Sequence, residues 1–380
     1  MENNTENDGT TNADTEQEKP FINYDVDVLD ASKDGEAVTF TIQTKTKEED
    51  DSEKGVVVLR QYEDFEYLSH CLAAHNDILS VVVPVLPPKP VITPSGAEAK
   101  TKKQLGKESK TMIGDDFTKD CKALQKYLQL VIAEKKLNGD ETLKEFLTKD
   151  KAPVRANVKK GLFTSLKGAL DDARFHNHKD IDDEFQSIRT TADHLAFATK
   201  NCNECYKKTN LAEQRFAHQI SNFTSVLRST AAQDETENDL STHMVKFAGY
   251  IDEYKKSLDK TTEIQEDTFG FTLDLYSRYL DSAKETLLRR TCKLVEFENA
   301  SKALDKAKPK NLEQLQIAKN EAEKVYEETT EHTRDEIKKF HNERVLAFKD
   351  AMSSLAERQI ENSTKMRDFL SQAISELQDL

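Results

Sequence analysis

The segment from residue 151 to 170, KAPVRANVKKGLFTSLKGAL, combines many cations with a helical spacing of apolar residues. It carries five cations and no acid: Lys151, Arg155, Lys159, Lys160 and Lys167. One apolar arc of the helical wheel holds Val158, Leu162, Phe163, Leu166 and Leu170. Such a helix lies in the interface of an anionic bilayer. Residues 151–175 are therefore predicted to form a basic amphipathic linker helix that binds membranes through Lys159, Lys160, Phe163, Leu166 and Lys167. The alternative is a linker helix that packs only against protein.

A second cationic stretch runs from Lys284 to Lys310. Its eight cations exceed its four acids, a local charge of +4 in a chain whose net charge is −15. Each Lys or Arg near an anionic leaflet contributes about 1 kcal/mol, so a cluster binds where single contacts could not. We predict membrane contacts from Arg289, Arg290, Lys293, Lys302, Lys306, Lys308 and Lys310. A solvated charged helix face is the alternative.

Catalytic and metal-binding motifs are missing from the sequence. It contains no GxSxG, Walker A loop, GxGxxG or HExxH. Cys202 and Cys205 form a lone CxxC inside a helical pattern, where thiols three residues apart are only neighbours. Eleven glycines leave few active-site loops. We expect no enzyme, no metal and no cofactor.

Bulk properties point to a cytosolic compartment. The negative net charge argues against nucleic-acid binding. No apolar run approaches the roughly 20 residues that span a bilayer, and the first residues lack the pattern of a signal peptide. Five scattered cysteines, an odd number, are unlike a disulfide framework.

The N-terminal part of the chain changes character twice. Residues 1–20 hold six acids and almost no apolar residue, which predicts a disordered acidic tail. Three runs rich in β-branched and aromatic residues follow, FINYDVDVLDA, AVTFTIQTKT and GVVVLRQYEDF, and predict a three-stranded antiparallel sheet. A helix is expected over 64–79, then an extended arm, VVVPVLPPKP, because proline excludes helix. Residues 91–115 are expected to be a loop, and helical patterns return in 117–132 and in TLKEFL.

Beyond residue 176 the pattern is that of long helices. No Gly or Pro occurs between Ala169 and Ala248, or between Lys310 and Leu380, although the mean globular helix has about 11 residues. Gly249 and Gly270 are expected in or beside a middle helix, and Pro309 at the turn after it. The last helix carries a one-sided apolar stripe that one chain cannot cover, which predicts a dimer.

Two stretches of the sequence resemble a known family. RQYEDF (Arg60 to Phe65), the proline arm and the YLQLV helix resemble the PX domain, a phosphoinositide-binding fold. LLRRTCKLVEFENASKALDKAK (Leu287 to Lys308) and RVLAFKDAM resemble the BAR domain of sorting nexins, especially the sorting nexin 5 and 6 subgroup. The resemblance implies an α+β PX domain over 21–150, followed by a three-helix, dimerising BAR domain over 176–380.

The same resemblance identifies the remnants of a phosphoinositide pocket: Arg60, Gln61, Tyr62, Lys89 and Asp120. In PX domains that bind 3-phosphoinositides, an Arg before the aromatic residue grips the phosphate; here that position is Gln61. Tyr62 keeps the aromatic ring that would stack on inositol, and Lys89 keeps the basic residue of the arm. A second phosphate-binding Arg is replaced by Asp120. The subgroup shares this loss and binds cargo tails instead.

The resemblance implies a non-enzymatic adaptor that dimerises, senses or induces membrane curvature and sorts cargo for endosome-to-Golgi retrieval. The implied partners are an anionic membrane, a sorting nexin 1 or 2 type protein in a heterodimer, transmembrane cargo tails and dynein-dynactin. The implied location is the cytoplasmic face of early endosomes and their tubules. The rival hypothesis is a coiled-coil scaffold or cytoskeletal linker whose PX fold serves only protein interaction.

Overall fold

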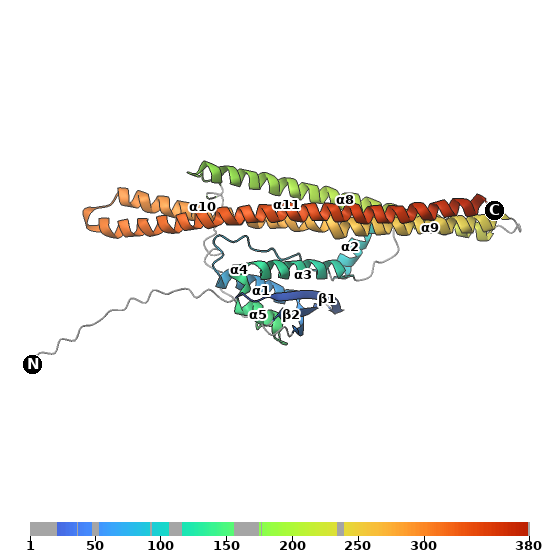
Figure 1. Cartoon of the computed structure of the whole chain (residues 1–380), viewed down its shortest axis with the longest axis horizontal. Helices are drawn as coiled ribbons and strands as arrows, with labels where there is room; N and C mark the ends of the chain where they lie inside the picture. Colours follow the sequence, from blue (N-terminus) through green and yellow to red (C-terminus); the bar gives the residue numbers. More distant parts are fainter. Residues whose placement is uncertain are drawn as a thin grey trace, which may run out of the picture.

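The computed structural model describes residues 21–35, 37–47, 53–91, 93–105, 116–155, 175, 177–233 and 239–378. Figure 1 shows long helices side by side along the long axis, with a small domain of sheet and short helices against one side of their middle part. The expected fold class, an α+β domain followed by an all-helical domain, is confirmed.

The sheet has three antiparallel strands in sequential order: β1 (Tyr24–Asp34), β2 (Ala37–Lys47) and β3 (Glu53–Gln61). Side chains alternate between its faces, so Val26, Phe40 and Val58 are buried together. Gly35 joins β1 to β2 with a φ of 60°, a conformation that glycine adopts without a Cβ clash. The pairing of β1 with β2 is irregular between Val28 and Asp30, where a bulge turns the strand.

Short helices cover the buried face of the sheet: α1 (Tyr62–His75), α3 (Thr118–Ala133), α4 (Lys135–Asn138) and α5 (Glu141–Thr148). Phe65 of α1 joins the layers, because its ring meets Phe40 at 6.0 Å and Phe146 at 4.9 Å between centroids, both edge to face. Strands and helices thus share one core.

Residues 94–105 correct the expectation of a loop, because Pro94–Leu105 form a helix, α2. Ala, Glu, Lys and Gln in this segment favour helix, and Glu98 pairs with Lys102 one turn later at 2.5 Å. Arg215 of the bundle donates to the carbonyl of Lys103 at 2.8 Å and so satisfies one of the last carbonyls of α2. The tertiary contact makes a short polar helix stable here.

The bundle contains three long helical rods within the described residues. The first is α8 (Asp183–Gln233). The second joins α9 (Asp239–Gln265), the π-helical turn η1 (Glu266–Gly270) and α10 (Phe271–Asp305). The third is α11 (Leu312–Gln378), which follows the 3₁₀ turn η2 (Pro309–Asn311). Gly249, Gly270 and Pro309 lie where the sequence predicts them. With 67 residues, α11 is about 100 Å long at 1.5 Å per residue.

A heptad seam of small and polar residues packs α8 into the bundle. Its members recur every seven residues and are all buried: Ala196, Asn203, Asn210, Ala217, Thr224 and Ala231. Asn203 donates to Asp274 Oδ1 at 3.1 Å and to Ser277 Oγ at 3.0 Å on α10. Buried polar residues in such a seam set the register between helices at some expense of stability.

The arm that follows α1 ties the small domain to the bundle. The carbonyls of Val81, Val82 and Val83 accept hydrogen bonds from Thr286 Oγ1 (2.9 Å), Tyr279 OH (3.2 Å) and Ser282 Oγ (2.6 Å), all on α10. The N–H of Val82 donates to Glu336 Oε1 of α11 at 3.2 Å, and its side chain belongs to the bundle core. The arm therefore fixes the two domains to each other.

Candidate lipid pocket, tail groove and membrane surfaces

The turn from β3 into α1 carries the first predicted pocket residue, Gln61. Its N–H donates to Asp64 Oδ2 at 2.7 Å and caps the start of α1. Arg155 reaches over this turn, because its Nε donates to Asp64 Oδ1 at 2.9 Å and its Nη2 to Gln61 Oε1 at 3.0 Å. A guanidinium therefore lies next to the position where the family's phosphate-binding Arg is missing, and it is already held by a carboxylate.

Arg60 is fully buried. Its Nε donates to the carbonyl of Phe146 at 2.9 Å, and its Nη1 and Nη2 donate to the carbonyls of Asp150 and Lys149. These bonds fasten the end of α5 to β3. The prediction of Arg60 as a pocket residue is therefore corrected, because its guanidinium serves the domain core.

Tyr62 is also buried, with 6% of its surface exposed. Its OH donates to the carbonyl of Pro87 at 2.5 Å, so the arm covers the ring. Burial, followed by the charge of Glu66, raises the pKa of Tyr62 to about 12. The ring is not open for stacking on a sugar or inositol, which corrects the role expected for it.

Lys89 and Asp120 do meet in one cavity of about 250 Å³, between the arm, the start of α3 and α10. Two walls come from the bundle, since Asp274 and Arg278 of α10 line it. Lys89 pairs with Glu63 at 2.6 Å, and this hydrogen bond lowers the pKa of Glu63. Burial alone would raise the pKa of Asp274, but Lys207 and Arg278 outweigh it and lower that pKa. The acids along this cavity offset its cations, unlike a phosphate cradle.

We expect that the double change Gln61→Arg and Asp120→Arg restores little binding to phosphatidylinositol 3-phosphate, about threefold at most. The guanidinium introduced at position 61 would lie beside that of Arg155, and the cavity keeps the acidic lining residues Asp116 and Asp274. Calorimetry with vesicles containing this lipid measures the effect. A gain of tenfold or more (an order-of-magnitude threshold, about 1.4 kcal/mol) would show that the cavity admits the headgroup.

A groove that sequence reasoning missed runs between β1 and α3. Its volume is about 540 Å³, and Val28, Asp30, Ala31, Gln125 and Lys126 are among its lining residues. Side chains satisfy edge donors of β1 there: Val28 N–H donates to Gln125 Oε1 at 3.0 Å, and Ala31 N–H to Asp30 Oδ1 at 2.7 Å. β1 is an edge strand, so these bonds occupy places where another strand could pair. No local pattern in the sequence announces the groove, because two distant segments form it.

The two arginines predicted in the cationic stretch are buried, which corrects their assignment to a membrane surface. Arg290 is fully buried and ion-paired with Asp180, also fully buried. Arg289 donates from Nη2 to the carbonyl of Val81 at 2.6 Å, and burial lowers its pKa. Helical periodicity could have predicted the burial of Arg290. This residue lies three positions after Leu287 and four before Leu294, on the same helix face, and both leucines are buried.

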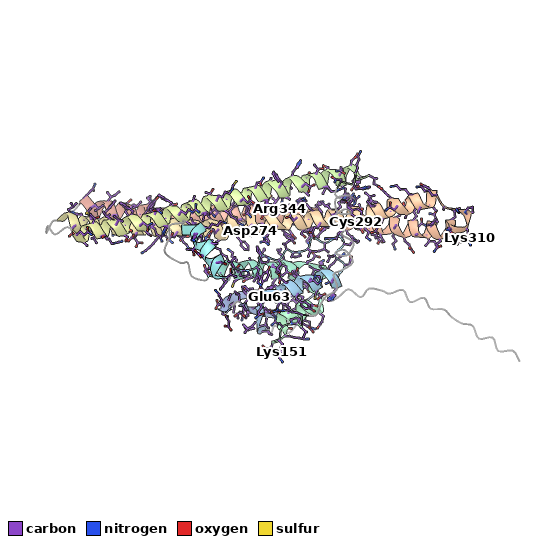
Figure 2. All side chains as sticks on the ribbon, turned by 180° about the vertical axis from the view of Figure 1, so that it is seen from behind. Glu63, Lys151, Asp274, Cys292, Lys310 and Arg344 are labelled. Carbon is purple, nitrogen blue, oxygen red and sulfur yellow. The ribbon has the colours of Figure 1, made fainter. Side chains whose placement is uncertain are left out.

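Among the lysines predicted in this stretch, Lys302, Lys306, Lys308 and Lys310 are exposed, whereas Lys293 is half-buried. Lys293 pairs with Glu296 at 2.9 Å and Lys302 with Glu298 at 3.3 Å, and these partners reduce the charge they offer. Lys306, Lys308 and Lys310 are at the turn between α10 and α11, and within the described part of the chain they have no ion-pair partner. Figure 2 shows Lys310 at the extreme end of the bundle. A cluster of unpaired cations therefore forms one tip.

Lys159, Lys160, Phe163, Leu166 and Lys167 lie outside the described residues, so their role stays a prediction. The chain on either side of them is well anchored. Arg155 holds the end before them, and after them His178 Nε2 lies 3.2 Å from Glu298 Oε1 while Asp180 pairs with Arg290. The segment thus leaves from the small domain and returns at the bundle.

No helix in the described ranges is both long and apolar enough to cross a membrane. Nor do the described residues contain a group of three or more His, Cys, Asp or Glu side chains arranged to hold a metal ion.

Comparisons with known proteins agree across the chain. A PX domain family model matches residues 49–150. Sorting nexin-6 of Homo sapiens and of Mus musculus is 26% identical over 360 residues, which cover 89% of this chain and 87% of the relative. Together these matches support a PX-BAR sorting nexin related to sorting nexin-6. Sorting nexin-32 of Mus musculus is 23% identical over 382 residues, covering 93% of this chain and 92% of the relative. The cryo-EM structure of the SNX-BAR Mvp1 tetramer shares the fold, with a TM-score of 0.50 and 16% identity over 92% of this chain and 99% of that one.

Similarity to this family supports a role in membrane trafficking as an adaptor. The small domain is a PX domain, and the helical bundle has the SNX-BAR fold. The PX domain suggests contact with phosphoinositide membranes.

Proposed function

We propose that this sorting nexin is a non-catalytic, endosomal membrane-remodelling adaptor that dimerises through its BAR domain and sorts cargo for retrieval to the Golgi. The observation that carries the proposal is the bundle itself, about 100 Å long and tipped with three lysines that lack ion-pair partners among the described residues. A rigid rod with cationic ends supplies both a shape and an affinity for a curved anionic surface.

Dimerisation is supported by apolar side chains that the single chain leaves exposed along its helices. They include Phe197 (71% exposed) and Val226 on α8, and Leu346 and Ile360 (68% exposed) on α11. Apolar patches of this kind mark interaction surfaces. Following the family resemblance, we propose a sorting nexin 1 or 2 type partner in a heterodimer, and a further link to dynein-dynactin.

The PX domain is proposed to bind a cargo tail rather than a 3-phosphoinositide. The cavity at Lys89 and Asp120 is about 250 Å³ and is lined in part by acidic side chains, whereas the groove beside β1 is about 540 Å³ and lies along an edge strand. An extended tail could pair with the β1 edge and displace the bonds that Gln125 and Asp30 now make.

Sedimentation with anionic vesicles separates this function from the rival scaffold. The chain, together with a sorting nexin 1 type partner, is expected in the pellet at low salt, and electron microscopy should show tubules. A coiled-coil scaffold would stay in the supernatant, and that result would reject the membrane-remodelling proposal.

The tip is expected to act through charge. Replacing Lys306, Lys308 and Lys310 with Glu should weaken vesicle binding about tenfold or more at low salt, and the difference should shrink as salt shortens the Debye length. Sedimentation over a salt series measures this, with Lys324→Glu, an exposed lysine on α11, as a control. An effect independent of ionic strength would contradict a Coulombic tip.

A further inference from the structure

The groove beside β1 is not built by the PX domain alone. Phe271, the first residue of α10 in the BAR domain, lines it together with β1 and α3. Lys122 of α3 makes the connection, because its Nζ lies 4.9 Å from the centre of the Phe271 ring and donates to the carbonyl of Asp267 at 2.6 Å. Whatever occupies the groove therefore meets both domains.

The π-helical turn η1 provides the place where α3 attaches. Lys119 pairs with Glu266 and Lys122 with Asp267, the first two residues of that turn. Gly270 closes the turn, and a Cβ there would lie 2.9 Å from the carbonyl oxygen of Gln265, so a larger residue would disturb it. π-turns inside long helices are frequent at functional sites. Here the turn holds Phe271 at the end of the groove.

The charged side chains along the groove differ in whether they already have a bonding partner. Two carboxylates that line the groove accept hydrogen bonds from nearby backbone N–H groups. Asp30 accepts from Ala31 N–H at 2.7 Å, and Asp116 accepts from Thr118 N–H at 3.0 Å. Lys122 is engaged with Asp267. Lys126, half-buried and one helical turn further along α3, has no hydrogen bond or ion pair among the described residues. A partly desolvated cation of this kind favours a carboxylate in the ligand.

We infer that the groove beside β1 is completed by the BAR domain. We further infer that it selects an extended segment of a partner protein carrying a carboxylate toward Lys126 and an apolar side chain toward Phe271. This inference rests on the proposed binding of cargo tails at β1. Because the ligand touches α10, its binding is coupled to the docking of the PX domain on the bundle.

The test uses the full chain and two fluorescein-labelled peptides of alternating Val and Thr, one with a central Glu and one with a central Lys. Fluorescence anisotropy should show the Glu peptide binding the unchanged chain about tenfold more tightly than the Lys peptide. Lys126→Glu should reverse that preference. Phe271→Ala should weaken the Glu peptide about tenfold, while Leu59→Ala, an exposed position on β3, should not change binding.

The outcomes distinguish the inference from the function on which it rests. Ala31→Pro removes a backbone N–H of the β1 edge. If this change abolishes binding but Lys126→Glu and Phe271→Ala do not alter it, the groove beside β1 stands and the role of the BAR domain is overturned. If neither peptide binds the unchanged chain or the chain without residues 1–20, the groove beside β1 is rejected as a binding site. The charge reversal at Lys126 keeps the test decisive even if Phe271→Ala disturbs the domain contact. Binding that appears only after removal of residues 1–20 would assign the groove to the chain's own acidic tail and overturn a partner as occupant.

Discussion

Vesicle tubulation should be lost when Phe163 and Leu166 are both replaced by Glu. Each apolar anchor that enters the interface contributes about 1.5 to 3 kcal/mol, so the pair accounts for at least a hundredfold in affinity, and two new carboxylates add repulsion from an anionic leaflet. The loss should persist at low salt, because the wild-type contribution of these residues is hydrophobic and poorly screened. Electron microscopy of vesicles with the chain in complex with its partner measures the effect.

Dimer formation is the control for this pair of changes. Analytical ultracentrifugation should report the same dimer as for the unchanged chain, since neither residue belongs to the apolar stripes of the long helices. Phe197→Glu, at an exposed position on α8, adds a charge to the apolar surface proposed for dimerisation. This variant should weaken the dimer in the same measurement. Normal tubulation by the Phe163→Glu, Leu166→Glu chain would show that residues 151–175 are only a linker.

Removal of Asp180 should destabilise the bundle by about 3–5 kcal/mol, because Arg290 would remain buried without its carboxylate. Arg290 also donates to Tyr326 OH at 2.7 Å and to Thr330 Oγ1 at 3.1 Å, and it lies 4.0 Å from the centre of the Phe185 ring. These neutral contacts orient the guanidinium but cannot neutralise its charge. Chemical denaturation of Asp180→Ala, followed by circular dichroism, measures the free energy of unfolding.

A matched variant separates burial from the mere loss of an ion pair. Asp252→Ala removes the partner of Arg228, a pair whose side chains are 42% and 33% exposed, and should change the free energy of unfolding by less than about 1 kcal/mol. Adding Arg290→Met to Asp180→Ala should recover part of the lost stability, since the unpaired charge is gone. Equal losses in Asp180→Ala and Asp252→Ala would show that burial is not the cause.

Features with a local origin were predictable from the sequence. Alternating β-branched residues give the three strands, and the stretches without Gly or Pro give the long helices, including the turn at Pro309. Asp120, which the sequence singles out, lies in the cavity beside the arm. These inferences needed only periodicity and residue type.

Features that depend on distant contacts were not predictable in this way. Arg289 looks like a surface cation until Val81, more than two hundred residues earlier, supplies its acceptor. Tyr62 is hidden because Pro87 folds over it, and α2 is helical because α8 supports it. The groove beside β1 needs Phe271 from the other domain. In each case the environment of the side chain is decided by tertiary packing, which overrides local propensity.

The bonds between the arm and α10 also constrain how the protein is made. Val81 accepts from Thr286, and 205 residues separate the two. A ribosome adds about 5–20 residues per second, so roughly 10 to 40 s pass between synthesis of the arm and synthesis of the helix that donates to it. During that time the valines of the nascent arm are without the surface that later covers them. The arm is therefore where we expect a chaperone to bind the growing chain, and where a ribosome that stalls before residue 286 would leave an apolar segment exposed.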